Sequence, residues 1–572
     1  MSLQGIALPK NWRDTGLIVA ISLFACTAAF LLCYLTMPIR NLTAFFLYQQ
    51  DRWLLLGAMM ITLFSSRRID RHEVAFRPAR WLAPAIALAL VSLCYAGHYW
   101  LLSGYAMSRD EQMALFDASI FESGKLVAPL AAEWVRHASA LNTLFMLPVE
   151  HPSAWISAYL PMNAVLHAAV GLVADAALTG PLLVGIGAIA LHGCIRILWP
   201  DKPEASLVAL LLYALSGQIV ITGMTSYAMT AHLALNLTWL WLFLQRRRMA
   251  DLGALAVGFV AVGLHQPLFH PLFVAPILML LLKERNWQRA AFFAVGYLMV
   301  CAFWLLWPKW MLALITGPES VMAAHDVDYL TRLIDTVRAG DSARFSNMAA
   351  NLLRFVSWQH ILLIPLVAAS LPAIWRGGLP AALAWGVALP ICVMLLILPY
   401  QGHGFGYRYL SGVTGNLILL AVYGWMELGD RRPIWRMMMR RATVASAVIL
   451  LPLQAWMAHS FYAPYARVSQ KIEKSNTEYV IIGAQDVSFS NDLVINRADV
   501  SNRPVRLIAE ELNDDLVRHI CRTGAAVALV DDHLLADISA YFGKQEQRRA
   551  AERNSILAPD LKSAGCHVSV LQ

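Results

Sequence analysis

Residues 103–125 read Ser103-Gly-Tyr-Ala-Met-Ser-Arg-Asp-Glu-Gln-Met-Ala-Leu-Phe-Asp-Ala-Ser-Ile-Phe-Glu-Ser-Gly-Lys125 and directly follow an apolar run. That run is long enough to cross a bilayer, so this segment begins at a boundary between membrane and water. Met113, Phe116 and Ile120 recur at helical spacing, which predicts an amphipathic helix that Gly124 ends.

Two adjacent carboxylates, Asp110 and Glu111, stand at the start of this predicted helix. Ser108 and Glu111 match a capping box, in which each side chain accepts a hydrogen bond from the backbone of the other. This favours a structural role for Glu111 and leaves Asp110 open between a first-turn residue that complements the helix dipole and a general base. Asp117, further along, is expected on a solvated face.

Composition indicates a membrane protein. The chain has 572 residues, of which 58% are hydrophobic and 14% charged, and its mean hydropathy is +0.55. A soluble protein of this length carries far more charge. The net charge of +8 does not point to nucleic acid, because Lys and Arg lie mainly in short loops between apolar runs.

Each membrane crossing needs about 20 apolar residues, and the sequence predicts about thirteen crossings. They are expected at residues 15–37, 53–66, 81–102, 181–198, 205–223, 229–245, 250–265, 268–283, 289–307, 358–374, 379–398, 410–426 and 442–460. The apolar segment Ala154–Val173 is interrupted by Pro161, Asn163 and His167, and we expect it to be interfacial or re-entrant.

The positive loops set the orientation. Those near residues 195–202, 245–248, 283–285, 375–378 and 430–436 all fall on the cytoplasmic side if Ala154–Val173 does not cross. The N-terminus is then cytoplasmic. On the outer side lie the loop 103–180, the turns 265–271 and 400–409, and the loop 308–357. Asp326 and Asp328 in the last of these loops are expected to be solvated, with the alternative that one of them reaches the cavity.

The polar segment 465–572 differs in kind from the rest. Residues 479–484, 503–509, 525–532 and 567–571 read as strands and Glu511–Thr523 as a helix, which predicts a small α/β domain outside the membrane. Cys521 and Cys566 fall within it and could form a disulfide in an oxidising compartment; the sequence leaves their pairing open.

A glycine-rich outer turn, Tyr400-Gln-Gly-His-Gly-Phe-Gly-Tyr-Arg-Tyr409, contains the second group of candidate residues. Glycine lets backbone approach a ligand, and Arg408 can bind phosphate oxygens in a bidentate fork. The alternative is an interfacial anchor of aromatic and arginine side chains. His265, Gln266 and His270 favour structural roles, because a lone histidine in a helix hairpin is usually a hydrogen-bonded structural group. The two histidines are a poor signal for a metal site, since no carboxylate lies near them in sequence.

In order and sidedness, these features resemble the C-type (GT-C) glycosyltransferases, in particular the protein mannosyltransferases and the lipid A aminoarabinose transferases. The resemblance covers residues 83–460. It rests on the outer Asp110-Glu111 followed by Gly124-Lys125-Leu126, on Tyr213–Tyr227, on Gly263-Leu-His-Gln-Pro267 and on Gly402-His-Gly-Phe-Gly-Tyr-Arg-Tyr-Leu410. Two departures are the extra crossings before the core and Gln266, where members of the family carry Arg.

The resemblance implies transfer of a sugar from a polyprenyl-phosphate donor to an acceptor hydroxyl of a glycolipid, polysaccharide or protein, with inversion. By analogy the catalytic residues are Asp110, as general base, and Glu111. Arg408, His403 and Tyr409 would bind the donor phosphate, and His265, Gln266, His270 and Lys125 would line the cavity. No cofactor is implied, and metal dependence stays open.

The predicted organisation is therefore a multi-pass α-helical protein of the bacterial inner membrane. It comprises an N-terminal hairpin with a cytoplasmic loop (1–80), a GT-C-like core (81–460) and a periplasmic α/β domain (465–572). The hypothesis requires Asp110 and Arg408 to open into one lipid-accessible cavity. The competing hypotheses are a transporter or flippase of a lipid-linked saccharide and a non-catalytic scaffold that presents residues 465–572.

Overall fold

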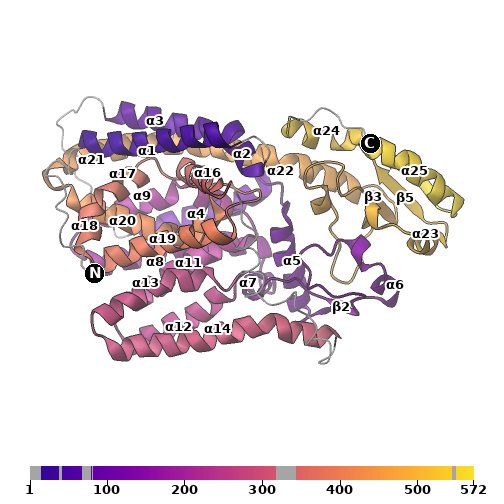
Figure 1. Ribbon diagram of the computed structural model, residues 1–572, viewed down its shortest axis with the longest axis horizontal. Coiled ribbons are helices and arrows are strands. Elements are labelled where there is room, and N and C mark those ends of the chain that lie inside the picture. The colour runs from indigo at the N-terminus through magenta and orange to yellow at the C-terminus, as the bar shows by residue number, and fades with distance from the viewer. Residues whose placement is uncertain (1–14, 38–40, 67–78, 80, 317–342, 544–548) are drawn as a thin grey trace. The chain divides into compact units, whose positions relative to one another are not determined.

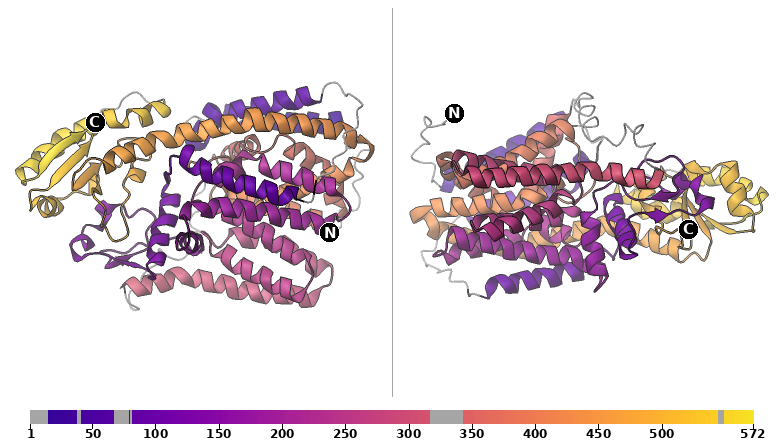
Figure 2. Two further views of the ribbon diagram at one scale, coloured as in Figure 1. Left: turned by 180° about the vertical axis from the view of Figure 1, so that it is seen from behind. Right: turned by 90° about the horizontal axis from the view of Figure 1, so that it is seen from below.

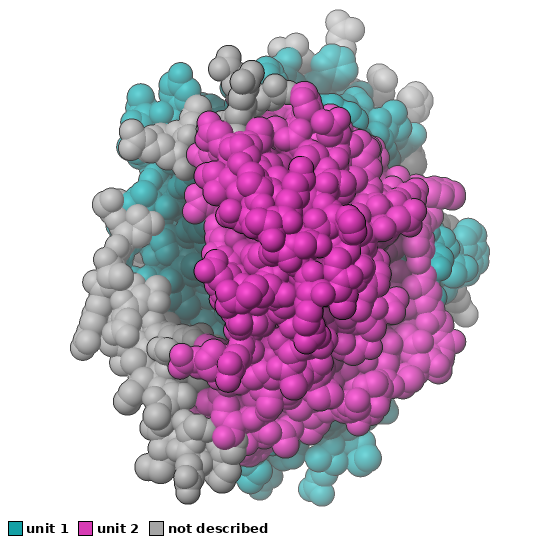
Figure 3. Space-filling model, turned by 90° about the vertical axis from the view of Figure 1, so that its right-hand side faces the viewer, with its two compact units in different colours: residues 1–95, 178–305, 328–457 teal, residues 96–177, 306–327, 458–572 magenta. Residues whose placement is uncertain are grey.

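The computed structural model describes residues 15–37, 41–66, 79, 81–316, 343–543 and 549–572. Asp326 and Asp328 lie outside these described residues. The chain divides into two compact units, which Figure 3 distinguishes by colour. The first contains residues 1–95, 178–305 and 328–457, and the second contains residues 96–177, 306–327 and 458–572.

The first unit is helical, and its elements are labelled in Figure 1. They are α1 (Thr15–Thr36), α2 (Leu42–Phe46), the π-helix η2 (Leu47–Asp51), α3 (Arg52–Ser65), α4 (Leu82–Trp100), α8 (Thr179–Leu198), α9 (Pro203–Ala214), α10 (Gly217–Thr222), α11 (Ala228–Leu244), α12 (Arg248–Val262), α13 (Phe269–Lys283), α14 (Trp287–Thr316), α16 (Arg344–Ser357), α17 (Leu363–Ala369), α18 (Leu371–Arg376), α19 (Leu379–Ile397), η7 (Arg408–Val413), α20 (Thr414–Glu427), η8 (Gly429–Arg431), α21 (Arg432–Ala445), η9 (Ser446–Leu450) and α22 (Leu451–Glu473). The chain passes between the two units within α4, α14 and α22.

Seven helical stretches are long and apolar enough to cross a membrane, counted over the described residues. They are Thr15–Thr36, Leu82–Trp100, Ala176–Leu198, Trp287–Thr316, Leu379–Ile397, Arg408–Glu427 and Gly429–Glu473. The longest single helix among them, α14, can be followed as one unbroken ribbon in Figure 2. These apolar helices support a multi-pass membrane protein.

The six other predicted crossings are helical but shorter or interrupted. Helices α3, α11, α12 and α13 have 14 to 17 residues. The crossing predicted at 205–223 is divided into α9 and α10, and the one at 358–374 into α17 and α18. The segment predicted to be interfacial forms α7 (Met162–Gly171), whose 10 residues are too few to cross a bilayer.

Small residues allow helices of the first unit to approach closely. Helix α20 packs against α17, and a Cβ atom at Gly424 of α20 would come within 1.9 Å of the Leu366 carbonyl oxygen. Without a glycine at this position the two helices could not pack at their present separation. Close packing through small residues is the usual way in which helices associate inside membranes.

The second unit joins the loop after α4 to the C-terminal segment. Its elements are α5 (Arg109–Glu122), β1 (Ala128–Pro129), α6 (Ala132–Val135), η3 (Ala138–Leu141), β2 (Ala154–Trp155), α7, β3 (Tyr479–Ile482), η10 (Ser490–Leu493), β4 (Val505–Ile508), η11 (Ala509–Glu511), α23 (Asp514–Cys521), β5 (Ala526–Val530), α24 (Asp532–Tyr541), α25 (Arg549–Ser563) and β6 (His567–Leu571).

Strands β3 to β6 form a parallel sheet in the order β4-β3-β5-β6. Each strand lies where the alternation of apolar residues predicts one. Cys521 at the end of α23 is bonded to Cys566, which precedes β6, with an S–S distance of 1.98 Å. This answers the question of pairing that the sequence leaves open.

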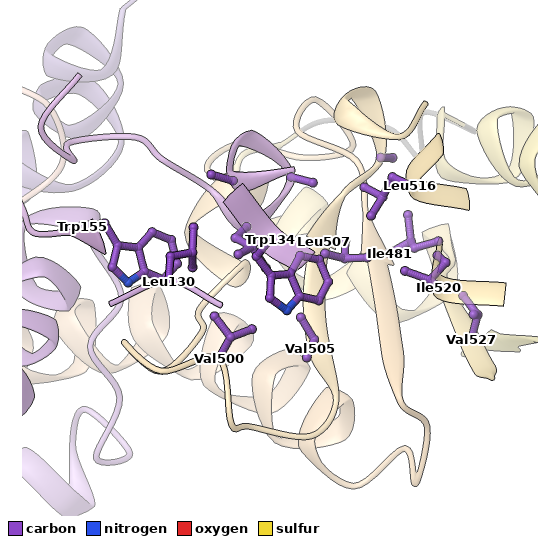
Figure 4. Packing of buried hydrophobic residues seen from close by; sticks show 14 of the residues in the cluster. Leu130, Trp134, Trp155, Ile481, Val500, Val505, Leu507, Leu516, Ile520 and Val527 are labelled. Carbon is purple, nitrogen blue, oxygen red and sulfur yellow. The ribbon is translucent and has the colours of Figure 1, made fainter. Parts of the chain in front are cut away.

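One hydrophobic core serves both the loop 103–180 and this sheet. Figure 4 shows Trp134 of the loop beside Val505 and Leu507 of the sheet region. Trp155 of the loop and Ile481 of β3 belong to the same buried cluster. Apolar burial is the main stabilising term in folding. The loop that contains Asp110 is therefore folded together with residues 479–571.

Candidate functional site

The start of α5 is fixed by the capping box that its sequence predicts. The Ser108 hydroxyl accepts a hydrogen bond from the Glu111 backbone N–H at 3.2 Å, and the Glu111 carboxylate accepts one from the Ser108 N–H at 3.2 Å. Both contacts satisfy donors that a helix start otherwise leaves unpaired.

Glu111 is buried beneath the first turn of α5. Its side chain is 1% exposed, and the same carboxylate oxygen that caps the helix also accepts a hydrogen bond from the Tyr462 hydroxyl at 2.8 Å. The backbone N–H of Ser108 and the hydroxyl of Tyr462 thus both donate to this carboxylate. These contacts agree with the structural role that the capping pattern favours, and the catalytic role that the resemblance implies for Glu111 stays a prediction.

Asp110, one residue earlier, is oriented differently. Its side chain is partly exposed, and its carboxylate accepts a hydrogen bond from the hydroxyl of Tyr159. Tyr159 follows Asp110 by 49 residues in an irregular segment, and no local pattern indicates it. A phenol that donates to a carboxylate orients it and stabilises its charged form, which is the form that accepts a proton.

Arg109 ties the same helical turn to the surrounding loops. It is 5% exposed, and its guanidinium donates to the carbonyl oxygens of Asn142, Leu144 and Val494 and to the side chain of Gln112. Burial lowers the pKa of Arg109 to about 10, so it stays charged at neutral pH. The first turn of α5 is therefore held on both sides of Asp110.

Asp117 is buried, so the expectation that it is solvated is wrong. It is 2% exposed, and it accepts hydrogen bonds from the Ser157 hydroxyl and, at 3.1 Å, from the Ser157 backbone N–H. Desolvation raises its pKa to about 7. The error arises because its partner lies 40 residues away and cannot be inferred from helical spacing.

Lys125 lies beyond the other end of α5. Gly124, with φ +73°, ends the helix, and the Lys125 N–H donates back to the Ile120 carbonyl at 3.3 Å. The Lys125 side chain is exposed. Because α5 has 14 residues, Lys125 stands about 20 Å along the helix axis from Asp110. It is therefore not part of the immediate surroundings of Asp110.

The first unit contains the glycine-rich turn. Arg408 is 8% exposed, and its guanidinium carbon lies 5.0 Å from the centre of the Tyr227 ring. The Tyr227 hydroxyl lies 3.0 Å from Nδ1 of His403, which is also 8% exposed. Arg408, His403 and Tyr227 thus form one cluster, which we call the arginine cluster. Tyr227 was part of the resemblance but was not assigned to the site from sequence.

Glycine is required at position 404 of this turn. Its φ is +136°, a conformation that side chains rarely adopt, and a Cβ atom there would lie 2.5 Å from Cδ of Arg408. At Gly402 a Cβ atom would meet Arg408 only at 3.8 Å, an ordinary contact. Gly404 therefore gives Arg408 its place in the cluster, whereas Gly402 does not.

Buried amides hold the same turn in place. The side chain of Gln401 accepts from the Arg408 N–H at 2.7 Å and donates to the Gly406 carbonyl at 3.0 Å. Gln218 donates to the Tyr407 carbonyl at 2.9 Å and to the Ser411 hydroxyl at 2.7 Å. Amides that are satisfied in this way rigidify the polar interior of the unit.

An ion pair supports the turn from the N-terminal helices. Arg354 donates to Asp51 at 2.8 Å and to the Gly404 carbonyl at 2.6 Å, and both side chains of the pair are 1% exposed. Trp358 donates to the other oxygen of Asp51 at 2.7 Å. Asp51 of η2 thus supports the position of Gly404 through Arg354.

The three candidate residues of the turn at 265–271 differ in burial. His270 is fully buried, with its two ring nitrogens 2.7 Å from Asn236 and from the Tyr297 hydroxyl, so it packs inside the protein rather than lining a cavity. His265 and Gln266 are partly exposed. Tyr409 stacks on Phe269, with ring centres 5.8 Å apart, which places its ring beside this turn.

Among the described residues, no group of three or more His, Cys, Asp or Glu side chains is close enough to hold a metal ion. Neither Asp110 nor the arginine cluster is thereby assigned a metal. The chemistry available at these positions is that of a partly exposed carboxylate and a buried guanidinium.

Comparison with known proteins found similar solved structures. ArnT from Cupriavidus metallidurans bound to undecaprenyl phosphate has 12% sequence identity, covers 74% of this chain and 86% of its own, and superposes with a TM-score of 0.49. The apo state of the same protein has 13% identity, 78% and 91% coverage and a TM-score of 0.36. ArnT is a lipid A aminoarabinose transferase, a group that the sequence motifs resemble. Neither the family models nor the curated proteins gave a match.

The raised pKa of Asp117 predicts a pH-dependent stability. Between its ordinary pKa of 3.8 and about 7, the buried carboxyl keeps its proton in the folded protein and loses it in the unfolded chain. The folded state then binds more protons, so the free energy of unfolding falls as pH rises, by about 1.4 kcal/mol per pH unit from this group.

Thermal unfolding of the detergent-solubilised protein, followed by tryptophan fluorescence between pH 4.5 and 8, tests this expectation. Asp117→Asn should flatten the dependence on pH, because its amide stays neutral. The matched variant is Asp537→Asn, which removes an exposed carboxylate from a surface ion pair and should keep the slope. Equal slopes for the wild type and Asp117→Asn would contradict the assignment.

Proposed function

We propose that this protein transfers a sugar from a polyprenyl-phosphate-linked donor to an acceptor hydroxyl at the periplasmic face of the bacterial inner membrane. The observation that carries the proposal is the setting of Asp110: a partly exposed carboxylate in the first turn of a fully capped helix, oriented by the Tyr159 hydroxyl. Apolar helices long enough to cross a membrane supply the environment that a lipid-linked donor needs.

In the proposed reaction Asp110 is the general base. It takes the proton of the acceptor hydroxyl while the acceptor oxygen forms a bond to the anomeric carbon. The bond between that carbon and the phosphate oxygen breaks, and the phosphate leaves with the electron pair. One displacement of this kind inverts the anomeric configuration. Tyr159 orients the base and is a positioning residue.

Arg408 is proposed to stabilise the departing phosphate. A guanidinium matches phosphate oxygens in a bidentate fork, and its attraction grows as negative charge develops on the leaving group. Tyr227 contacts both His403 and Arg408. His403 and Arg408 are therefore both proposed to donate hydrogen bonds to the same anion. Tyr409, stacked on Phe269, is proposed to flank the phosphate. The acceptor is a glycolipid, a polysaccharide or a protein.

Asp110→Asn should lower transfer by about 10²–10⁴-fold, the usual contribution of a general base. The substitution keeps the shape of the side chain and an oxygen that can accept from Tyr159. Tyr159→Phe should cost less, about tenfold, because it removes one hydrogen bond and leaves the base. The measurement is transfer of radiolabel from polyprenyl-phosphate sugar in membranes.

Glu122→Gln is the matched control, because Glu122 is an exposed carboxylate at the far end of the same helix. Its transfer rate should equal that of the wild type. Equal rates for Asp110→Asn and the wild type would remove Asp110 from the mechanism.

Arg408→Ala should reduce transfer by about 10²–10³-fold, the cost of losing one group that stabilises a developing anion. His270→Ala should reduce it less once rates are normalised to folded protein, because His270 is fully buried between Asn236 and Tyr297. The reverse ranking would mean that the phosphate is bound at the 265–271 turn.

Gly404→Ala should imitate the loss of Arg408, because the added methyl group collides with the arginine side chain and strains a positive φ. Gly402→Ala, two residues away, makes an ordinary contact and should retain activity. The measurement is the ratio of the two transfer rates at equal amounts of folded protein. A ratio of one would show that the position of Arg408 does not limit transfer.

A further inference from the structure

A cavity of about 730 Å³ opens in the first unit between α1 and the segment η2–α3. Its volume lies within the range of about 300–1,000 Å³ that is typical of ligand sites. Its lining includes Phe30, Tyr34, Tyr48, Arg52, Trp53 and Leu56. Tyr34, Trp53 and Leu56 are all more than half exposed, so the cavity opens at the surface of the unit.

Polar and apolar side chains both line the cavity. Tyr34 near the end of α1, Tyr48 in η2 and Arg52 at the start of α3 contribute polar groups. Phe30, Leu56 and Met59 lie further along the same two helices and contribute apolar surface, with the hydroxyl-bearing Thr27 beyond Phe30 on α1. A lining of this kind can accommodate a molecule with one polar head and a hydrocarbon tail.

Two buried polar atoms in the lining have no hydrogen-bond partner within the described residues: the Tyr48 hydroxyl and Nε of Arg52. Tyr48 is only 5% exposed, and its ring is held by edge-to-face contacts with Phe30 and Tyr34, whose ring centres are each 6.2 Å away. An unpaired buried donor destabilises the folded protein, so a ligand that supplies acceptors is expected.

The charge of Arg52 is also uncompensated within the described part of the chain. The neighbouring carboxylate, Asp51, is occupied by Arg354 and Trp358, and Arg52 makes a cation–π contact with Trp53 at 4.7 Å. A cation beside membrane hydrocarbon is costly unless an anion meets it. The π-helix η2 precedes this arginine directly, and such insertions occur frequently at functional sites.

The surface around the cavity indicates where the ligand comes from. Helix α1 exposes Phe24, Leu31, Leu32 and Leu35 over half or more of their surface, and it has the composition of a membrane span. Such a face is surrounded by bilayer lipid. The molecules that reach the opening with both an anionic head and a hydrocarbon tail are then chiefly the anionic phospholipids of the membrane itself.

We infer that this cavity is a binding site for an anionic glycerophospholipid, with the phosphate on Arg52 and Tyr48 and one acyl chain along Phe30, Leu56 and Met59. Arg52 supplies the charge that selects an anionic head, and the hydroxyl of Tyr48 supplies a second donor. The site is separate from the proposed glycosyl transfer and does not depend on it.

Photo-crosslinking of the full chain in phosphatidylcholine nanodiscs tests the inference. The probes are phosphatidylglycerol and phosphatidylcholine with the same diazirine-bearing acyl chain, and labelled peptides from residues 15–65 are quantified by mass spectrometry. The phosphatidylglycerol probe should label them about tenfold more than the phosphatidylcholine probe, because a charge-assisted hydrogen bond is available only to a net anionic lipid without a competing head-group cation.

Arg52→Gln should abolish the preference between the two probes. Leu56→Trp should fill the apolar part of the cavity and reduce labelling by both probes. Leu63→Trp is the matched control, because Leu63 is also exposed on α3 but is not part of the lining, and its labelling should be unchanged. Thermal unfolding of each variant separates loss of the site from loss of the fold.

Equal labelling of the wild type by the two probes would overturn the inference, as would unchanged labelling of a folded Leu56→Trp variant. A third arm adds unlabelled polyprenyl phosphate or inorganic phosphate. Displacement by inorganic phosphate at the same concentration as by unlabelled phosphatidylglycerol would show a site for free phosphate and would overturn the inference. A further outcome is displacement of the probe by polyprenyl phosphate at a concentration at which unlabelled phosphatidylglycerol has no effect. This result would assign the cavity to polyprenyl phosphate and would also overturn the inference. Displacement by unlabelled phosphatidylglycerol alone would support it.

Discussion

The position of Asp110 depends on the Glu111 carboxylate, which is buried beneath the first turn of α5. This carboxylate closes the capping box with Ser108 and accepts a hydrogen bond from Tyr462, and these contacts fix the residue at which the helix begins. Arg109 fixes the same turn through carbonyl oxygens of distant loops. Asp110 lies between these two anchored residues. The orientation of its partly exposed carboxylate therefore depends on the contacts of Arg109 and Glu111 as well as on its own hydrogen bond from Tyr159. A base that acts on a hydroxyl needs this kind of preorganisation.

In the first unit, the position of the Arg408 guanidinium is also fixed by surrounding residues. Arg408 is brought over Tyr227 by a turn whose Gly404 leaves room for it, and the carbonyl of Gly404 is held by Arg354. Arg354 is itself neutralised by Asp51 of η2. Removing one partner of a buried pair leaves an uncompensated charge, which costs about 3–5 kcal/mol. The N-terminal segment that contains Asp51 therefore has a structural function in the turn that contains Arg408.

The sequence predicted those features whose determinants are local. The capping box, the end of α5 at Gly124 and the strands β3 to β6 follow from spacing over a few residues, and apolar runs located the helices. The sequence could not predict features that depend on residues far apart in the chain. Tyr159 lies 49 residues from Asp110, and Arg354 lies 303 residues from Asp51. Asp117 was misjudged for the same reason, since burial by a distant segment overrides the pattern of the helix on which it lies. The contacts of His270 with Asn236 and Tyr297, which lie 34 and 27 residues away, could not be inferred from its own turn either.

The central claim is that one carboxylate, Asp110, activates the acceptor for a single direct displacement. A mechanism with one base and no covalent intermediate changes the configuration at the anomeric carbon, whereas a mechanism with a carboxylate nucleophile passes through two displacements and preserves it. The most direct test is to determine by NMR the anomeric configuration of the sugar in the donor and in the first product formed by the purified protein. We expect inversion, and a product that retains the donor configuration would contradict a single displacement with Asp110 as the base.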